Sequence, residues 1–220
     1  MNPYDHALSS VRHYGGRAED YQELENWLDA SKATLAHFTH RALRHHRQGV
    51  AEAVQLFGDH LTNCAGDQIA VASLGLQHIA EDCSIIPDAA DWLHHLEAPA
   101  GLFPDAAPNP EALAAQSARR FGGSADQFML LHSWFLATTN WFEDARHLAM
   151  RHHAFGIFEA EARFGVTLPT SGGAVPTRIV AEAHVRAVLG RIPSATDFLR
   201  RIKGQPWMAA AQSPRRLGLR

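Results

Sequence analysis

Histidine is the residue type with the clearest chemical potential in this sequence. There are 15 histidines among 220 residues, and several lie in the run His40-Arg-Ala-Leu-Arg44-His45-His46-x-x-Gly49. Neutral imidazole is the commonest protein ligand for transition metals, and an unperturbed imidazole gains a proton near pH 6.5. The run therefore predicts a metal site, a catalytic site or a switch that responds to pH.

The histidine run occurs twice, because the chain is a tandem repeat. Gly15 aligns with Gly122 at an offset of 107 residues, and the alignment continues without a gap to Gly58 and Gly165. About 16 of these 44 positions are identical, which indicates an internal duplication. After one single-residue gap the match resumes at an offset of 106. The histidines that both copies share are His40, His45, His46 and His78 in the first and His147, His152, His153 and His184 in the second.

The spacing of the shared histidines limits what a single helix could do with them. We expect one continuous helix from Ser31 to Phe57, with Thr138 at the equivalent start in the second copy. On such a helix His40 and His45 point about 140° apart, so they cannot serve one metal ion together. A π-bulge or a break would realign them, or they reach separate partners. His78, from a later helix, could complete a site that this segment cannot close.

A stripe on the expected helix adds candidates for acid–base chemistry. His45, Gly49 and Glu52 lie at i, i+4 and i+7. A glycine inside a helix predicts close approach by a backbone, a ring or a ligand. Glu52 is the predicted general base or the group that orients an imidazole, and Arg44 would neutralise an anionic substrate or pair with Glu52. The equivalents in the second copy are Arg151, His152, Gly156 and Glu159.

Two other interpretations of the histidines stay open. Shared histidines could pack the core or the interface between the repeats, or they could form a pH switch. His132 aligns with Glu25; it could bind a metal or a partner, and we expect it on the surface. Six histidines have no counterpart in the second copy and are expected to be solvated: His6, His13, His37, His60, His94 and His95.

The elements that must position these residues are predicted to be helices. Asn2 and Pro3 favour a helix start, and Gly15-Gly16 favours its end. The predicted fold class is all-α, with two homologous helical repeats that pack as a pseudo-two-fold pair, an intramolecular mimic of a dimer. A short hairpin near residues 62–71 and 170–180 is compatible with the pattern. The predicted domains are residues 1–96, a proline-rich linker over 97–113, and residues 114–220, which end in a basic tail.

Composition excludes several function classes. A net charge of −3 argues against an extensive nucleic-acid surface. No apolar run approaches the roughly 18–20 residues that a membrane span needs. The two cysteines and the absence of a secretory pattern favour a cytoplasmic location. We find neither a glycine-rich phosphate loop nor a Gly-x-Ser-x-Gly motif in the sequence.

The run from Phe38 to Gly49, F-T-H-R-A-L-R-H-H-x-x-G, resembles a small single-repeat family of bacteria and their phages that is catalogued as a domain of unknown function. Other stretches with this resemblance are Asn26-Trp27-x-Asp29-x-Ser31-Lys32, Gln77-His78 with Glu81-Asp82, Ile86-Pro87, Asp91-Trp92-Leu93 and Gln205-Pro206-Trp207-Met208. The resemblance implies a cytoplasmic location and no established activity. The second copy departs from the pattern, with Leu136 for Asp29 and Val188 for Asp82. A site that needs the full set is therefore expected in one copy only, or shared between the two.

These observations predict a cytoplasmic, histidine-rich metal-binding protein, with a metal-dependent hydrolase-like enzyme as its catalytic form. Zn is the first candidate metal, and Fe or Ni come next. The predicted ligands are the eight shared histidines, and the predicted partner is a small anionic substrate or another protein. The alternative is a non-enzymatic bacterial or phage accessory protein that binds a host or partner protein, with its histidines packing the repeat interface.

Overall fold

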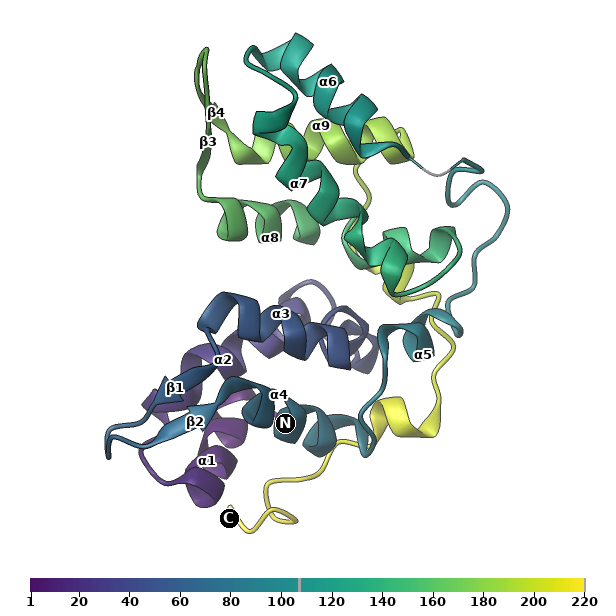
Figure 1. Ribbon diagram of the computed structural model, residues 1–220. Coiled ribbons are helices and arrows are strands. Elements are labelled where there is room, and N and C mark those ends of the chain that lie inside the picture. Colours follow the sequence, from purple (N-terminus) through teal and green to yellow (C-terminus); the bar gives the residue numbers. More distant parts are fainter. Residues whose placement is uncertain (107, 220) are drawn as a thin grey trace. The chain divides into compact units, whose positions relative to one another are not determined.

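The chain forms two compact units in a computed structural model that describes residues 1–106 and 108–219 (Figure 1). The first unit is Met1–His95 together with the segment that begins at Ile202, and the second unit is Leu96–Arg201. Residue 107 of the predicted linker and Arg220 of the predicted tail lie outside the described residues. The pseudo-two-fold pairing of the repeats stays a prediction.

Both units have the same order of elements. The first contains the helices α1 (Pro3–Tyr14), α2 (Glu19–Asp29), α3 (Arg47–Phe57), α4 (Val71–Cys83) and α5 (Ala89–Leu93), with the strands β1 (His60–Thr62) and β2 (Gln68–Ala70). The second contains α6 (Pro110–Phe121), α7 (Asp126–Leu136), α8 (Ala154–Phe164), α9 (Thr177–Leu189) and α10 (Thr196–Leu199), with β3 (Thr167–Thr170) and β4 (Gly173–Pro176). Short 3-10 helices are η1 (Ala30–Ala33), η2 (Phe38–Leu43), η3 (Ala137–Asn140), η4 (Ala145–Met150) and η5 (Pro206–Ala209).

The fold is mostly helical, but it is not strictly all-α. Each unit has one antiparallel hairpin, with Leu61 opposite Ile69 in the first and Leu168 opposite Val175 in the second. In each unit the hairpin joins two helices of the same bundle, α3 to α4 and α8 to α9. No helix in the described part of the chain combines the length and the apolar character that a membrane crossing requires.

Local signals in the sequence determine the start of each unit. The side chain of Asn2 accepts a hydrogen bond from the Asp5 N–H, with Pro3 in the first turn, as predicted. Asn109 and Pro110 begin α6 in the same way, so four residues of the predicted linker are helical. Gly15 has a φ of 75°, a left-handed value that favours glycine, where α1 ends.

The predicted continuous helix from Ser31 to Phe57 is wrong. The chain instead runs through η1 and η2, and His46 adopts an extended conformation (φ −158°, ψ 165°) that interrupts any helix before α3. The His46 imidazole then caps α3, because its Nδ1 accepts a hydrogen bond from the Gly49 N–H at 3.0 Å. Ser31 does not cap a helix; its hydroxyl lies 3.1 Å from His40 Nδ1.

Gly49 allows the backbone before α3 to pass close to the first turn of that helix. A Cβ at this position would collide with the backbone carbonyl of Arg44, and a Cβ at Gly156 would collide with the carbonyl of Arg151. The prediction of close approach is therefore confirmed, and the approaching group is backbone. Apolar cores form around this framework, on Leu24, Leu28 and Leu74 in the first unit and on Phe128, Phe135 and Val180 in the second.

Candidate metal centre

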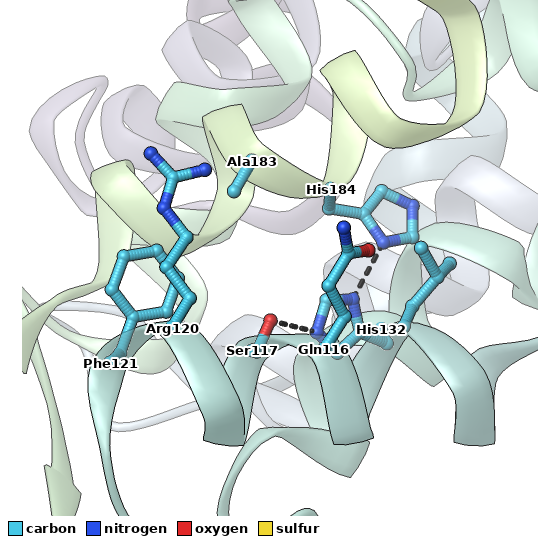
Figure 2. Close-up of a pocket in the computed structure, with 8 residues that line it drawn as sticks. Gln116, Ser117, Arg120, Phe121, His132, Ala183 and His184 are labelled. Atoms are coloured by element: carbon cyan, nitrogen blue, oxygen red, sulfur yellow. Dashed lines mark hydrogen bonds between the residues drawn. The ribbon is translucent and has the colours of Figure 1, made fainter.

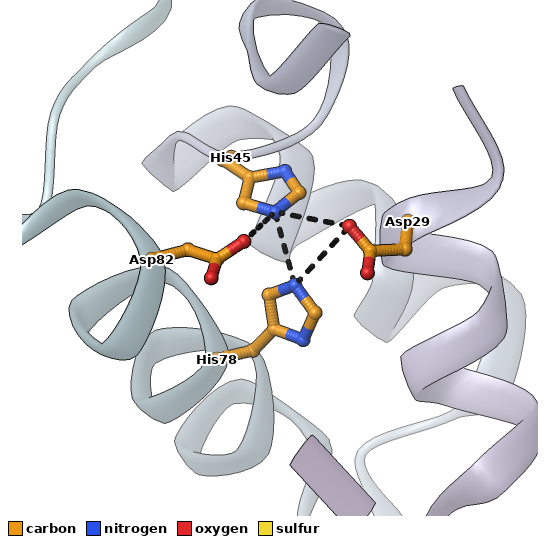
Figure 3. Close-up of side chains that lie close together, drawn as sticks. All are labelled: Asp29, His45, His78 and Asp82. Carbon is orange, nitrogen blue, oxygen red and sulfur yellow. Dashed lines mark hydrogen bonds and ion pairs between the residues drawn. The ribbon is translucent and has the colours of Figure 1, made fainter. Parts of the chain in front are cut away.

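Four buried side chains of the first unit converge on one point (Figure 3). Asp29 is the last residue of α2, His45 lies in the turn between η2 and α3, and α4 contributes His78 and Asp82 one helical turn apart. Their exposed fractions are 3%, 0%, 1% and 0%, respectively. The break before α3 matters here, because it turns His45 toward α2 and α4.

The separations of the ligand atoms fit a tetrahedral ion. The Nε2 atoms of His45 and His78 lie 2.9 Å apart, and His45 Nε2 is 3.4 Å from Asp82 Oδ2. Asp29 Oδ1 is 3.7 Å from His45 Nε2 and 4.0 Å from His78 Nε2. A tetrahedral zinc ion with bonds of about 2.0 Å places its ligand atoms about 3.3 Å apart. The observed distances bracket that value, so small side-chain movements would accommodate an ion.

Asp29 is the unusual member of the cluster. Within the described part of the chain, neither of its carboxylate oxygens accepts a hydrogen bond. Lys32 Nζ lies 3.5 Å from Oδ2, and Oδ1 faces the two imidazoles. Burial acts to raise the pKa of Asp29, but His78 and His45 outweigh burial and lower it. The group is thus a buried carboxylate, held in its charged form, that faces two nitrogen ligands.

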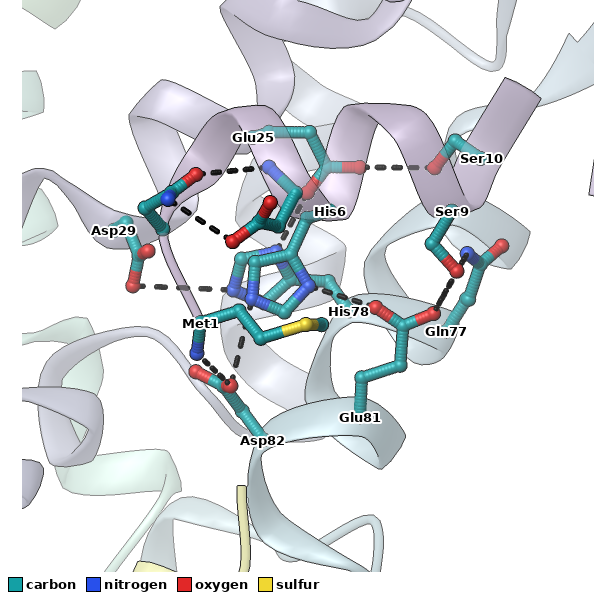
Figure 4. Close-up of polar contacts among 12 residues, drawn as sticks. Met1, His6, Ser9, Ser10, Glu25, Asp29, Gln77, His78, Glu81 and Asp82 are labelled. Atoms are coloured by element: carbon teal, nitrogen blue, oxygen red, sulfur yellow. Dashed lines mark hydrogen bonds and ion pairs between the residues drawn. The ribbon is translucent and has the colours of Figure 1, made fainter. Parts of the chain in front are cut away.

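A polar network surrounds the four groups and fixes their orientation (Figure 4). Glu25 Oε2 lies 2.6 Å from His78 Nδ1, so the imidazole donates there and turns Nε2 toward the cluster. Asp82 contacts the Met1 amino group through Oδ1 and Arg41 Nε through Oδ2, each at 3.0 Å. A carboxylate behind a histidine is a common support for a metal ligand, because it fixes the tautomer and raises the basicity of the ring.

His6 belongs to this network, so the prediction that it is solvated is wrong. It is fully buried, stacks on His78 with ring centroids 3.8 Å apart, and lies 2.7 Å from Glu81 Oε2. Burial acts to lower its pKa, but contacts with Asp82 and Glu81 outweigh burial and raise the pKa to about 9. Together with Glu25 and His78, His6 forms a second group of closely spaced ligand atoms that shares His78 with the first.

The pKa values of His45 and Asp82 are both lowered, which leaves the imidazole neutral and the carboxylate charged. Burial lowers the pKa of His45 to about 3, so its imidazole is neutral and able to bind a metal at neutral pH. Burial acts to raise the pKa of Asp82, but His45 and His6 lower it far below its usual range. Neutral imidazoles and charged carboxylates are the forms that ligate divalent metals.

The structure brings only two of the first copy's predicted ligands together. His45 and His78 meet in the cluster, whereas His46 caps α3 and His40 contacts Ser31. Arg44 places its guanidinium 4.0 Å from the centre of the Trp27 ring and donates to the Trp27 carbonyl. Glu52 lies on α3, half-buried and outside the four-residue cluster. The acid–base roles of Arg44 and Glu52 therefore stay predictions.

The second unit keeps the imidazole pair and loses the carboxylates. His152 and His184 face each other through Nε2 atoms 3.1 Å apart, as His45 and His78 do. Leu136 and Val188 occupy the aligned positions of Asp29 and Asp82, and Phe135 stacks on His184 at 4.4 Å. His147 contacts Thr138 and His153 caps α8, and Arg151 lies over Trp134, as their counterparts do; Glu159 lies on α8.

His132 is buried, so its predicted surface position is wrong. Its Nδ1 lies 2.7 Å from His184 Nδ1 and its Nε2 lies 2.9 Å from the Ser117 hydroxyl (Figure 2). Beside it is a cavity of about 30 Å³, room for roughly one water molecule, which Arg120 and Gln116 also line. The three imidazoles form a neutral hydrogen-bonded chain, because burial lowers the pKa of each of them.

Sequence reasoning missed three groups at the centre: the carboxylates of Asp29 and Asp82 as ligands, and the buried His6. One signal for Asp82 was present in the sequence, because His78 and Asp82 are spaced i, i+4 and therefore share a helix face. A second signal was the change of both carboxylates to apolar residues in the second copy.

The chain belongs to the family described as Domain of unknown function (DUF6915). The family model matches twice, over residues 1–101 and 108–208, which confirms the tandem repeat. A comparison with curated proteins finds no match, and a comparison with solved structures finds none either.

Proposed function

We propose that the first unit binds one divalent transition-metal ion through Asp29, His45, His78 and Asp82. The observation that carries this proposal is the buried Asp29 carboxylate, which faces both imidazoles and accepts no hydrogen bond from a described residue. A buried charge is costly unless it is paired or coordinates a metal. An ion at the centre of the cluster would supply that partner.

The types of ligand atom in the cluster narrow the choice of metal ion. Two imidazoles and two carboxylates suit Zn best, with Fe and Ni next, because imidazole binds these ions well and carboxylate adds hard oxygen ligands. In the bound state the proton between the two Nε2 atoms must leave, since both nitrogens face the ion. Glu25 then holds the remaining proton on His78 Nδ1.

The burial of the cluster supports a structural ion better than a hydrolytic one. Catalytic zinc keeps an open position for water or substrate, whereas structural zinc has four protein ligands. All four groups are at most 3% exposed. The ion would join α2, the turn before α3 and α4, so the free energy of binding would become free energy of folding. A protein that a structural metal ion stabilises is therefore the function that this geometry supports best.

Elemental analysis of protein purified without a histidine tag tests the proposal. We expect about one ion per chain, and a melting temperature that rises on addition of Zn to metal-free protein. Asp29→Leu installs the residue of the second copy and should abolish both effects without preventing folding, because it removes a buried carboxylate that accepts no hydrogen bond from a described residue. Asp59→Asn, at an exposed carboxylate, is the control. Equal metal content in Asp29→Leu and the wild type, or none in either, would refute the proposal.

The second unit favours the alternative function, partner binding, on one specific observation. Leu130 and Val166 are 74% and 71% exposed, where the first copy has Glu23 and Asp59. Large exposed apolar residues mark interaction surfaces when they form a patch, and Leu130 lines a surface hollow together with Phe164 and Leu168. Leu130→Glu and Val166→Asp, which restore the residues of the first copy, should weaken association with any partner and leave metal content unchanged. Unaltered association of the double variant would contradict this assignment.

A further inference from the structure

The last segment of each repeat belongs to the other unit. The second family match ends at Met208, but its residues from Ile202 onward belong to the first unit. The first match ends at Gly101, but its residues from Leu96 onward belong to the second unit. The Lys203 N–H donates to the His95 carbonyl within the first unit. The Glu97 N–H donates to the Arg201 carbonyl within the second. Each unit is therefore assembled from both halves of the sequence.

An aromatic contact docks each of these segments. Trp207 lies edge-on against Trp92, with ring centroids 4.8 Å apart. Phe103 stacks on Phe198, with centroids 5.4 Å apart. Trp92 and Phe198 are equivalent positions of the two repeats. The two contacts are thus counterparts, which gives every experiment on one of them a matched control in the other.

The segment from Pro206 to Gln212 lies beside the elements that carry the metal cluster (Figure 1). Met208 is fully buried, and its carbonyl accepts a hydrogen bond from Arg41 Nη1 at 3.0 Å. The Gln212 N–H donates to the Glu81 carbonyl at 2.8 Å, next to Asp82 on α4. The segment thereby contacts η2 through Arg41 and the last turn of α4 directly.

Arg41 links this segment to a proposed ligand. Its Nη1 also donates to the Asp82 carbonyl at 3.1 Å, and its Nε lies 3.0 Å from Asp82 Oδ2. The Met208 carbonyl therefore helps to hold a guanidinium that fixes both the backbone and the carboxylate of Asp82. The second copy has Leu148 at the position of Arg41 and Val188 at the position of Asp82, so it has neither the link nor the ligand.

We infer that the segment Pro206–Gln212 is a positioning element of the metal centre in the first unit and that it acts through Arg41. The inference rests on the proposed metal binding. The segment supplies no ligand; it determines where the Asp82 carboxylate stands relative to His45. The second repeat, which has lost its own carboxylates, is then required because its last segment completes the site of the first.

Cobalt binding to the full-length protein tests the inference, because Co(II) reports both affinity and coordination geometry through its visible absorption. Trp207→Ala removes the docking contact at a distance from the ligands and should weaken Co(II) affinity by roughly 10–100-fold, the usual effect of losing an outer support of a metal ligand. Its d–d bands should also change in position or intensity. Phe103→Ala, the matched control, should alter neither the affinity nor the spectrum.

A double-mutant cycle tests the route through Arg41. Arg41→Leu should weaken Co(II) binding at least as much as Trp207→Ala does, and the double variant should be no weaker than Arg41→Leu alone. Additive effects, or equal effects of Trp207→Ala and Phe103→Ala, would overturn the inference. Where Trp207→Ala does not fold, Arg41→Lys replaces it, since lysine keeps the charge but cannot reach Asp82 and Met208 together. Unchanged affinity in Arg41→Lys would likewise overturn it.

The failures of the two proposals are distinguishable. Absence of Co(II) and Zn binding in the wild type would overturn the metal site itself and this inference with it. Binding in the wild type with the same affinity and spectrum in Trp207→Ala would overturn only the role of the segment.

Discussion

The two repeats hold their histidines in the same framework but surround one imidazole pair with opposite environments. In both repeats a hydroxyl group contacts the first histidine of the run, which is His40 or His147. The third histidine of the run, His46 or His153, caps a helix, and an arginine lies over a tryptophan ring. The facing Nε2 atoms are 2.9 Å apart in the first unit and 3.1 Å in the second. The carboxylates beside this pair in the first unit are replaced by leucine and valine in the second.

This difference separates the histidines that hold the fold together from the residues that could bind a metal ion. Imidazoles that bond to the backbone or to hydroxyl groups are present in the second unit, which lacks the two aspartates, so their presence in both copies does not depend on a metal. The carboxylates are present only where four ligand atoms converge. The shared histidines are therefore weak evidence for metal binding on their own, and the unshared acidic residues carry the argument.

Removal of the equivalent imidazole from each repeat should give the largest difference between the two units, in metal content. His78→Ala deletes a proposed ligand and should reduce the metal content from about one ion per chain to none. His184→Ala deletes its counterpart and should leave the metal content unchanged, because Leu136 and Val188 offer no ligand. Elemental analysis of both variants measures the difference. Metal loss in His184→Ala, or retention in His78→Ala, would contradict the assignment of the site to the first unit.

Acidification of metal-free protein should open the second unit first. Burial lowers the pKa of the neutral imidazoles of this unit, which are His132, His147, His152, His153 and His184. Such a group contributes its full stability above the unfolded pKa of about 6.5 and loses it as pH falls toward the folded pKa, which is about 4 for His132 and His153. Each group can cost up to about 1.4 kcal/mol per pH unit in this window.

The first unit should respond differently. The pKa values of His40 and His45 are also lowered, but the pKa of His6 is raised to about 9. The contribution of His6 to the free energy of unfolding is therefore full below about pH 6.5 and is lost as the pH rises through 9. Hydrogen exchange by mass spectrometry between pH 7 and 5, corrected for intrinsic rates, reports each unit separately. Earlier opening of the first unit would show that the charge difference does not govern acid stability.

Substitution of the paired glycines should affect both units equally. Gly49→Ala and Gly156→Ala each place a methyl group against a carbonyl of the same turn, and overpacking of this kind costs about 1–3 kcal/mol. Chemical denaturation of each full-length variant, with spectroscopic probes that report its own unit, gives the two values. A large loss in only one repeat would show that the turn is not a common framework.

Glu25→His should give the smallest effect and refine the comparison. It copies the residue of the second repeat, where His132 keeps a hydrogen bond to the following histidine. The support of His78 would remain, but its negative charge would be lost, so Zn affinity should fall about tenfold, or about 1.4 kcal/mol. Competition with a chromophoric chelator measures it. An unchanged affinity would assign the support to hydrogen bonding alone.

The sequence predicted the parts of this molecule that local signals determine. Asparagine followed by proline began a helix in both copies, and self-comparison revealed the repeat. The break at His46 was missed, because an imidazole that caps a helix has no standard sequence signature and the apolar spacing continues across it. The stripe of His45, Gly49 and Glu52 consequently did not form on one helix.

The candidate centre was predicted only in part for a related reason. Asp29, His45 and His78 come from three elements that are distant in sequence, and only tertiary packing brings their ligand atoms within 4.8 Å. His6 lacks a counterpart in the second copy, where Leu113 aligns with it, and so seemed unconstrained. Comparison of the two copies identified the shared histidines, but it could not identify His6, Asp29 and Asp82 as members of a site, because the second copy lacks them.

Because the first unit includes the residues from Ile202 onward, it can be completed on the ribosome only after the second unit has been synthesised. The second unit is one continuous stretch of chain, whereas Arg41 waits for Met208, 167 residues later. At about 5–20 residues per second that delay is about 8–33 seconds. The half of the protein that emerges first is therefore completed last. During the interval Arg41 holds Asp82 without the hydrogen bond that the Met208 carbonyl later accepts from it.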